Sequence, residues 1–276
     1  MCKVLEVSRS SYYKWLKGDI SKRKLENQLL TDAIKKVFAE SKQTYGSPRI
    51  VKELKRNGCK VSKPRVAKLM RLAGLRSKVK KKYKITTDSN HCYPVSKNHL
   101  NRAFNPDELN KIWVSDITYI RTSEGWLYLT TIIDLYDRQV IGWSMSKSLK
   151  TIETIIPAWN MAISKRNIIK PIIFHSDRGV QYACYEFRNH IEANKLITQS
   201  MSRKGNCWDN AAAESFFKTI KSELVYHEKY TTIKQAELSV FEYIEVWYNR
   251  KRLHSALGYR TPIEVENEFN KSNNVA

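Results

Sequence analysis

The sequence predicts a small all-α domain followed by an α/β core that is built on a mixed sheet. Two observations support this fold class. Up to residue 76 the apolar residues recur at helical spacing, whereas three β-rich runs follow one another from residue 110. After those runs, helical and strand-like segments alternate, which is typical of a mixed sheet. With 276 residues, the chain is long enough for one large domain or two ordinary ones.

Charge divides the chain in a similar way. The net charge is +22, and residues 1–103 alone carry 27 Lys and Arg against 7 Asp and Glu. The N-terminal third therefore has a net charge of +20, and the remaining residues only +2. Such an excess indicates a polyanionic partner, of which nucleic acid is the usual one. The alternative is a basic surface that serves only solubility.

Composition argues against several other classes of protein. No apolar run approaches the roughly 18–20 residues of a membrane span, and the start lacks a signal-peptide pattern, so we expect a cytoplasmic protein. The five cysteines are scattered without a C-x-x-C pair, which indicates neither a disulfide framework nor a structural zinc site. His91, Cys92 and His99 lie near one another, but without a second cysteine they make a poor zinc site.

The predicted N-terminal domain begins with two helical segments. Residues 1–20 look like the last helix of a helix-turn-helix whose partner helix is missing, with Ser8 as the cap. A DNA-binding region of helix-turn-helix type is then predicted over residues 21–76. Its first helix covers residues 24–40, where leucine, isoleucine and phenylalanine recur at helical spacing.

Two shorter helices follow, and each has its own start and stop signals. Ser47 is predicted to cap the first, with Pro48 in its first turn and Gly58 at its end. Ser62 and Gly74 bound the second in the same way. Two short basic helices joined by a tight glycine-containing turn fit a helix-turn-helix, although such pairs also occur as plain packing units.

Basic residues in two places are predicted to contact DNA. Three of them lie along one side of the second short helix: Arg65, Lys68 and Arg71. Residues 77–103 have little periodicity and form a predicted basic linker, which can follow a phosphate backbone through Lys80, Lys81 and Lys82. A tether without a partner is the alternative for this segment.

The catalytic core is predicted over residues 104–226, and its first three strands form a meander. The runs KIWVSDITYI, WLYLTTIIDLY and QVIGWSMS are separated by short turns. Further on we expect a helix over about 151–164, a strand at 171–176, a helix at about 184–194 and a strand at 196–201. The stretch GNCWDNAAAESFFKTIKSE supplies the next helix. Helices near 231–248 and 262–269 form a C-terminal helical extension over 227–276.

Three acidic residues of the core have unusual settings. Asp116 lies inside the first strand, where a charged residue is disfavoured unless it faces a site. Asp177 follows a buried strand, at the end where functional groups gather in α/β sheets, and Glu214 lies on the helix after the next strand. Each has an ordinary alternative as a rim, turn or surface carboxylate. Together they predict a site for a hard cation such as Mg²⁺, which prefers carboxylate oxygens.

Four motifs, in order, give the sequence a resemblance to a known family. The segments WVSDITYI, FHSDRGVQY, SRKGNCWDNAAAESFF and YNRKRLHSALGYRTPIEV resemble the integrase core of bacterial insertion-sequence transposases. The resemblance covers residues 1–268 and is nearest to the second-frame (OrfB) product of elements read from two overlapping frames. It implies a ribonuclease-H-like fold and an Asp-Asp-Glu triad. Because the helix-turn-helix at the start lacks its partner helix, we expect the upstream-frame (OrfA) product either as a partner or as a segment fused to this chain.

The resemblance gives individual residues their roles. Asp116 and Asp177 match the two aspartates of the triad and Glu214 its glutamate, and the three would bind two Mg²⁺ or Mn²⁺ ions. Thirty-six residues separate Asp177 from Glu214, one more than is usual for the family. Lys221 matches a basic residue of the family. With Lys218 it shares the helical face of Glu214, where both lysines would contact DNA, unless they form only an ordinary Glu–Lys helix pair.

Neighbouring polar residues are given structural roles. Asp209 or Asn210 is predicted to cap the helix that carries Glu214. His175 stands two residues before Asp177, on the same side of the strand, so that a hydrolase dyad is conceivable. Because no nucleophile turn accompanies the pair, we assign His175 a supporting role instead.

The predicted function is therefore a DNA transposase. In the reaction that the resemblance implies, water attacks the phosphodiester at the element end and frees a 3′-hydroxyl, which then attacks another DNA phosphate. ATP is not required, and the sequence has no Walker-type glycine-rich loop. DNA and further copies of the chain on that DNA are the expected partners. The alternatives are a nuclease of the same fold and a non-catalytic DNA-binding regulator.

Overall fold

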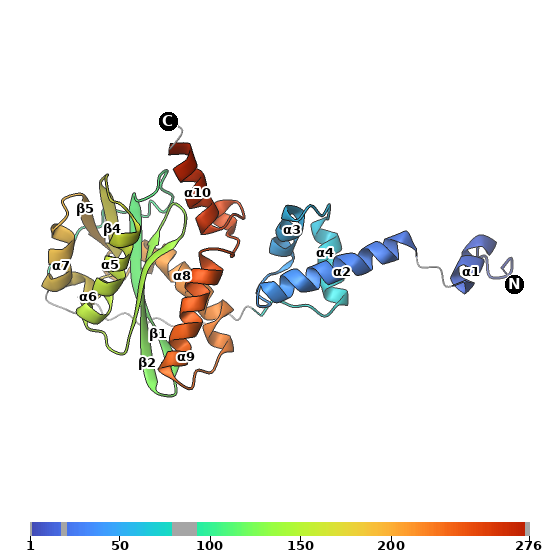
Figure 1. The fold of residues 1–276 in the computed structure, drawn as a ribbon, viewed down its shortest axis with the longest axis horizontal. Helices are drawn as coiled ribbons and strands as arrows, with labels where there is room; N and C mark the ends of the chain where they lie inside the picture. Colours follow the sequence, from blue (N-terminus) through green and yellow to red (C-terminus); the bar gives the residue numbers. More distant parts are fainter. Residues whose placement is uncertain (1, 18–20, 79–92, 274–276) are drawn as a thin grey trace. The chain divides into compact units, whose positions relative to one another are not determined.

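The chain divides into two compact units, Met1–Lys78 and Val79–Ala276. The computed structural model describes residues 2–17, 21–78 and 93–273. Figure 1 draws the first unit in blue to cyan and the second in green to red. The first unit is helical in its described part, and the second contains a five-stranded sheet with helices. The predicted fold class, an all-α domain followed by a mixed-sheet α/β core, is confirmed.

The N-terminal unit owes its core to three helices. The helices of its described residues are α1 (Arg9–Leu16), α2 (Lys22–Glu40), α3 (Ser47–Arg56) and α4 (Lys63–Leu72). The apolar residues that recur along α2 pack with those of α3 and α4, and the buried ones are Leu30, Ile34, Val37, Phe38, Ile50, Val51, Leu54, Val66, Leu69 and Met70. Helix α1 buries none of its residues. The hydrophobic periodicity therefore accounts for α2, α3 and α4 but leaves α1 outside the packed core.

The predicted starts of the two short helices differ in outcome. Ser62 caps α4, because its Oγ accepts the backbone N–H of Arg65 at 3.4 Å. The predicted cap of α3 is wrong: Gly46 is the N-cap residue, and Ser47 is already inside the helix. Pro48 in the first turn fixes the backbone there without a side-chain cap. Gly58 and Gly74 follow the two helices with positive φ angles of 81° and 68°, as predicted for glycine terminators.

The core sheet contains β1 (Ile112–Thr122), β2 (Gly125–Asp134), β3 (Val140–Ser146), β4 (Ile172–Ser176) and β5 (Ile197–Met201). Its order is β3-β2-β1-β4-β5. The meander β1–β2–β3 is antiparallel, whereas β4 is parallel to both β1 and β5. The sheet is therefore mixed, and the predicted strands are confirmed within a residue or two at their ends.

Pairing between β1 and β4 is short. It runs from Ile112 opposite Ile173 to Val114 opposite His175. Strand β1 continues for eight further residues, to Thr122, beside β2 alone. The two central strands thus separate just where the first two predicted site residues follow, which leaves space at the carboxyl end of β4.

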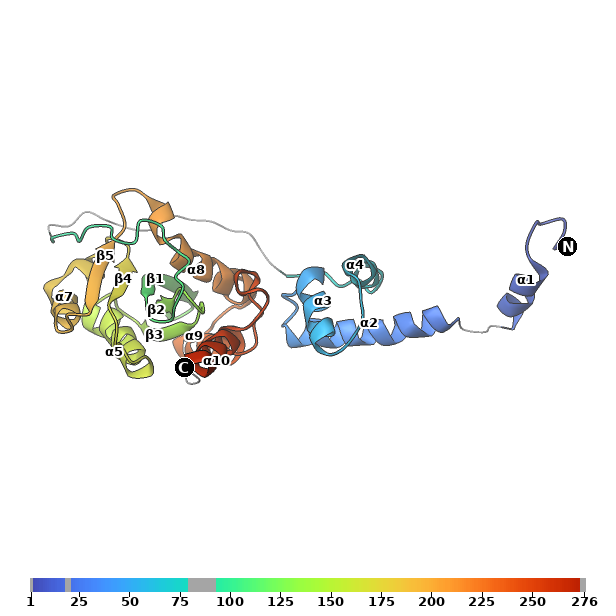
Figure 2. The ribbon, with the colours of Figure 1, turned by 90° about the horizontal axis from the view of Figure 1, so that it is seen from above.

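Helices cover both faces of the sheet (Figure 2). Helix α5 (Ile155–Lys165), after the short η1 (Thr151–Glu153), packs on β2 and β3, and α8 (Ala211–Glu223) and α9 (Ile233–Phe241) pack against β1. Gly142 of β3 allows α5 to come close, because a Cβ atom there would lie 2.1 Å from the carbonyl oxygen of Ala158. The apolar cluster between α5 and the sheet includes Trp113, Trp159 and Phe174.

The remaining elements connect or extend this core. They are α6 (Val180–Ala183), α7 (Tyr185–Glu192), η2 (Cys207–Asn210), η3 (Val225–His227), the π-helical η4 (Glu242–Tyr248), η5 (Ser255–Leu257) and α10 (Pro262–Asn273). The helix predicted near 231–248 is thus α9 continued by η4, and the last predicted helix is longer than expected. Within the described ranges, no helix has the length and apolar character needed to cross a membrane.

Candidate active site

Asp116 on β1 and Asp177 directly after β4 occupy equivalent positions relative to the β1–β4 pairing. Each follows the last β1–β4 pair, Val114 opposite His175, by two residues. Asp116 is half-buried on β1, and its Oδ1 accepts the backbone N–H of Ile117 at 2.8 Å. Because paired strands lie about 4.8 Å apart, the register brings the two carboxyl groups to the same end of the sheet.

The turn after β4 fixes the second carboxylate. Asp177 Oδ1 accepts the backbone N–H of Gly179 at 2.9 Å. A Cβ atom at Gly179 would lie 3.0 Å from the same oxygen, so a larger residue would crowd this contact. The glycine in the motif FHSDRGVQY therefore keeps the Asp177 side chain in its place.

Glu214 reaches the two aspartates from α8, and the pKa values reflect the approach. Burial holds the pKa of Asp116 well above its usual range, and the negative charges of Asp177 and Glu214 add to this. Burial and then the charge of Asp177 also raise the pKa of Glu214, although this residue is exposed. The structure thus brings the three predicted residues into one electrostatic group, with three like charges that repel one another.

The group is open in this conformation. Among the residues that the structure describes, no set of three or more His, Cys, Asp or Glu side chains is arranged to hold a metal ion. Helix α8 carries Glu214 at the fourth position from its start, in the first turn. The sheet fixes the positions of the two aspartates, whereas the position of Glu214 depends on how firmly α8 is held.

Tyr182 forms the buried floor beside the aspartates. Its hydroxyl lies 2.9 Å from Ser115 Oγ. Burial, followed by the charges of Asp116 and Asp177, raises the pKa of the Tyr182 phenol well above its ordinary value. Sequence reasoning missed this residue. The available signal was its position on the short helix directly after the Asp177 turn.

The two lysines predicted on the Glu214 face differ in their surroundings. Lys218 is exposed. Lys221 is half-buried, with its Nζ 5.3 Å from the centre of the Tyr119 ring. Burial lowers the pKa of Lys221, and the charge of Asp116 opposes this effect. Lys221 therefore lies beside the carboxylate group, with its cation between Asp116 and an aromatic ring.

Asp209 fastens the loop before α8, and it does not cap the helix as predicted. Its buried carboxylate accepts hydrogen bonds from Arg203 (backbone N at 3.0 Å, Nε and Nη2 at 2.8 Å), from Arg102 Nε at 3.0 Å and from Asn98 Nδ2 at 2.9 Å. These bonds, led by the Arg203 side chain, hold the pKa of Asp209 well below its usual range. Hydrogen bonds to an ionised group are strong, so Asp209 holds the loop to these donors and does not cap the helix.

Asn210 also departs from its predicted role. It occupies the N-cap position of α8 but makes no side-chain capping bond. Its Nδ2 instead donates to the backbone oxygen of Ser115 at 3.2 Å. Asn210 therefore ties the start of α8 to the residue before Asp116, which links two of the three carboxylate-bearing elements.

The other end of α8 is held by the C-terminal extension. Glu223 lies nine residues after Glu214, which on a helix places it on the opposite side. Its buried carboxylate pairs with Arg252, whose Nη2 donates at 2.7 Å, and accepts the hydroxyl of Tyr243 at 2.8 Å. The motif YNRKRLHSALGYRTPIEV supplies this arginine, and sequence reasoning assigned it no role. No local feature of the sequence indicates this pair, because its members are 29 positions apart.

His175 is a structural residue, consistent with its assigned supporting role. It is fully buried on β4, with Nδ1 2.8 Å from Ser200 Oγ and Nε2 3.2 Å from Ser202 Oγ. Burial lowers the pKa of His175 to about 4, so the ring is neutral near pH 7. Its two nitrogens are occupied by serines of β5 and the following loop, so the geometry favours sheet packing over a dyad with Asp177.

The end of the predicted linker runs along β5. Ser96 Oγ donates to Gln199 Oε1 at 3.0 Å, and the backbone N–H groups of His99 and Leu100 donate to Ser200 Oγ at 2.9 and 3.2 Å. This part of residues 77–103 is therefore attached to the core. Lys80, Lys81, Lys82, His91 and Cys92 lie outside the described residues.

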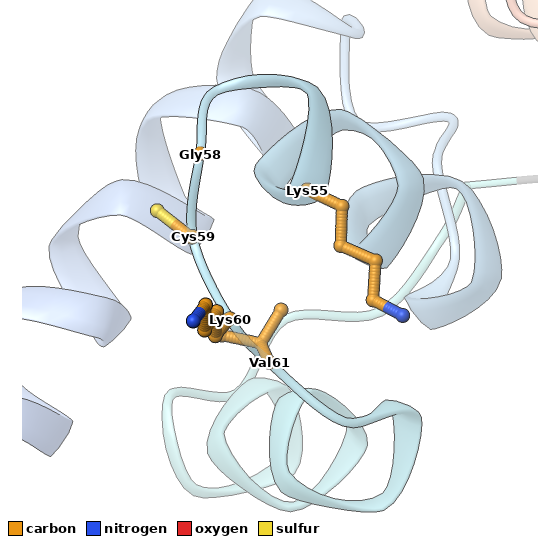
Figure 3. Close-up of a pocket in the computed structure, with 5 residues that line it drawn as sticks. All are labelled: Lys55, Gly58, Cys59, Lys60 and Val61. Atoms are coloured by element: carbon orange, nitrogen blue, oxygen red, sulfur yellow. The ribbon is translucent and has the colours of Figure 1, made fainter.

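The basic residues predicted on α4 have different environments. Arg65 donates from Nε and Nη2 to Asn27 Oδ1 at 3.0 and 2.7 Å, so its guanidinium is engaged by α2. Lys68 and Arg71 are exposed. Figure 3 shows a pocket of about 420 Å³ at the turn between α3 and α4, lined by Lys55, Gly58, Cys59, Lys60 and Val61. This pocket belongs to the N-terminal unit and contains none of the three carboxylates.

Comparison with known protein families covers most of the chain. Two family models, both described as an integrase core domain, match residues 106–207 and 195–262. A third, described as an HTH-like domain, matches residues 24–83. The matches separate the chain into the same helical and α/β parts as the structure. They also bear out the predicted integrase core and the helix-turn-helix-like region before it.

Several curated proteins are similar along almost their whole length. The "Insertion element IS600 uncharacterized 31 kDa protein" of Shigella sonnei is 41% identical over 271 residues, which are 98% of this chain and 99% of that protein. The "Transposase InsF for insertion sequence IS3A" of Escherichia coli (strain K12) is 40% identical over 270 residues, 97% of this chain and 93% of that protein.

Solved structures of viral integrases are similar at lower levels. The simian T-cell lymphotropic virus intasome contains a chain with a TM-score of 0.47 and 15% identity, over 84% of this chain and 73% of that one. The catalytic core domain of BIV integrase has a TM-score of 0.44 and 16% identity, over 59% of this chain and 98% of that one.

Proposed function

Because the chain belongs to the IS3-type family of insertion-sequence transposases, we propose that Asp116, Asp177 and Glu214 are the catalytic residues with which it transposes DNA. The family settles the activity class, transposition by an enzyme with an integrase core. One observation carries the assignment of residues. A strand, the turn after its neighbour and a helix each contribute one carboxylate to the same electrostatic group.

The donor set fits a divalent metal ion. Three carboxylates supply only hard oxygen ligands, which suit Mg²⁺ or Mn²⁺ and not softer metals. Their mutual repulsion, seen in the raised pKa values of Asp116 and Glu214, is what a bound cation would relieve. We propose two ions held by these three residues. Such ions, when bound, stabilise the charge that develops on the reacting phosphate oxygens.

The proposed reaction has two steps at phosphorus. In the first, a water oxygen bonds to the phosphorus at the element end, and the bond to the 3′-oxygen breaks to leave a 3′-hydroxyl. In the second, the oxygen of that hydroxyl bonds to a phosphorus of the target DNA, and the bond between this phosphorus and an oxygen of the target strand breaks. Each step breaks one P–O bond and forms one, so no external energy source is needed. We propose that Lys221, whose charge interacts with that of Asp116, holds the phosphate next to the reacting bond.

DNA contacts outside the site are proposed for the basic residues in both units. Lys218 extends the lysine face of α8, and Lys68 and Arg71 are the exposed cations of α4. Arg65 is proposed as a weaker contact, because its guanidinium already serves Asn27. Lys80, Lys81 and Lys82 lie outside the described residues and stay proposed contacts on charge alone.

The division of labour along the chain follows from these contacts. We propose that residues 1–20 and 21–76 recognise the element ends, that 77–103 link them to the core, and that 104–226 with the extension 227–276 perform the chemistry. Further copies of the chain would assemble on the DNA, with the OrfA product as partner or fused segment. We propose the cytoplasm as the location, because the relatives are bacterial and bacterial DNA lies there.

The test separates chemistry from binding. Asp116→Asn and Glu214→Gln are each expected to reduce cleavage at the element end by roughly a thousandfold or more while leaving DNA affinity within a few-fold. A matched control is Asp107→Asn, an exposed aspartate paired with Lys111 at 2.6 Å. Cleavage by either triad variant at the normal rate would contradict the assignment. Adding a target duplex distinguishes transposition from simple hydrolysis, because only a transposase yields joined product.

A further inference from the structure

We infer that the β1–β2 hairpin binds the DNA strand that leads away from the reacting phosphate, through Tyr119, Arg121 and Trp126. This inference rests on the proposed active site and extends it. Cations and rings alternate there: Lys221 Nζ lies 5.3 Å from the Tyr119 ring centre, and Arg121 Cζ lies 5.9 Å from that of Trp126. The two rings meet edge to face, with centres 5.1 Å apart.

Lys221 connects the hairpin surface with the active site, because its cation interacts with the charge of Asp116 and lies over the Tyr119 ring. Tyr119 and Arg121 follow Asp116 by three and five residues on β1, so their side chains project from the face of the strand opposite to that of Asp116. Arg121 pairs with Trp126 across the antiparallel ladder. Five residues of strand from Asp116 to Arg121 span about 17 Å at roughly 3.3 Å per residue. One strand of duplex DNA advances about 3.4 Å per nucleotide, so the hairpin would reach about five nucleotides from the reacting phosphate.

The side chains are exposed enough to meet a ligand. Trp126 is 45% exposed, and Arg121 is exposed as well. In the part of the chain that the structure describes, neither Arg121 nor Lys221 forms an ion pair with a carboxylate, so both cations are left for phosphate. Glu124 in the turn accepts the backbone N–H of Ile233 at 2.7 Å, which directs this acid toward α9.

The chemistry of the surface selects nucleic acid over other partners. Ring faces stack on bases of any sequence, and arginine binds phosphate or lies flat on a base. A purely structural explanation is a cross-strand aromatic pair that stabilises the hairpin. The two explanations predict different results, because a purely structural pair would not make the DNA affinity depend on the length of the DNA.

The experiment measures binding, so it does not depend on catalysis. Duplexes carrying the end of the insertion sequence that encodes this chain are trimmed one base pair at a time on either side of the reacting phosphate. The full chain is expected to lose on the order of tenfold in affinity when one side falls below about five base pairs. Trp126→Leu with Arg121→Gln is expected to show this loss already on the long duplex and no further loss on trimming.

Three comparisons make the result decisive. Trp126→Phe, with Arg121 unchanged, should keep the length dependence, because a ring face remains. Lys165→Ala is the matched basic control, because Lys165 lies away from the β1–β2 turn. It ends α5 next to Arg166, which pairs with Asp137 after the opposite end of β2. Asp116→Asn should keep the length dependence even though it abolishes cleavage, so failure of the proposed catalytic site would be seen separately. Normal, length-dependent binding by the Trp126→Leu, Arg121→Gln variant would overturn the inference, as would an affinity loss equal at every length.

Discussion

The N-terminal unit and the core both contain exposed ion pairs, but the core also contains pairs with both partners buried. Lys35 and Asp32 on α2 lie 3.7 Å apart with their side chains 56% and 74% exposed. Arg252 and Glu223 in the core lie 2.7 Å apart with 7% and 3% exposed. The exposed pair is screened by water and worth little, whereas removal of one buried partner leaves a charge without solvent. In the N-terminal unit the number of exposed charges therefore matters, whereas in the core the position of each buried charge matters.

The largest difference should appear in stability when one cation is removed from each unit. Arg252→Met leaves the Glu223 carboxylate buried without its partner, and the free energy of unfolding of the core should fall by about 3–5 kcal/mol. Lys35→Met should change that of the N-terminal unit by less than about 1 kcal/mol. Chemical denaturation measures both. Adding Glu223→Gln to Arg252→Met should recover much of the loss, because the unpaired charge is gone. Equal losses in the two units would break the comparison.

A smaller effect is expected at Asp209, which combines exposed and buried partners. Asp209→Asn should lower the free energy of unfolding by about 2 kcal/mol near pH 7, because charge-assisted bonds to two arginines are weakened. The pKa of Asp209 is depressed in the folded protein. Its contribution is therefore present above the ordinary pKa of 3.8 and is lost as the pH falls below that value.

The pH dependence separates Asp209 from other carboxylates. Denaturation of the wild type between pH 7 and pH 2.5 should show an acid loss of stability that the substitution Asp209→Asn removes. Asp107→Asn serves as the control, because the pKa of Asp107 is also lowered but its side chain is exposed. An acid limb that is unchanged by Asp209→Asn would contradict the role of this residue as the anchor of α8.

The smallest effect is expected for a single exposed cation of the N-terminal unit. Lys68→Ala should weaken DNA binding only a few-fold, since one of many phosphate contacts is lost. The slope of log affinity against log salt concentration should fall by about one. Lys36→Ala on α2 is the matched exposed control. An effect on cleavage as large as that of Glu214→Gln would show that charge acts by position in this unit too.

The predictable parts of the molecule are those with a local or periodic cause. The strands of the core alternate or run apolar, and each glycine or proline stop lies next to the element that it ends. Asp116 was recognisable because an acid inside a strand is disfavoured, and Asp177 because it ends a buried strand. The family resemblance then gave these residues and Glu214 their roles.

The parts that sequence reasoning missed depend on contacts between distant segments. Asp209 looked like a helix cap because caps are local, but its partner Arg102 lies 107 positions earlier in the chain. Arg252 and Glu223 are 29 positions apart, and neither carries a local sign of the pair. The prediction of Ser47 as a cap was wrong for a local reason. Helix α3 begins one residue earlier than predicted, with Gly46 as its N-cap residue.

The short pairing of β1 with β4 has a consequence for how the protein tolerates changes in length. Asp116 and Asp177 are aligned by backbone register, so segments inserted between these strands can grow or shrink without displacing either carboxylate. Glu214 has no such alignment, because a loop and a helix deliver it. Insertions in the loop between β5 and α8 should therefore be far less tolerated than insertions between β3 and β4.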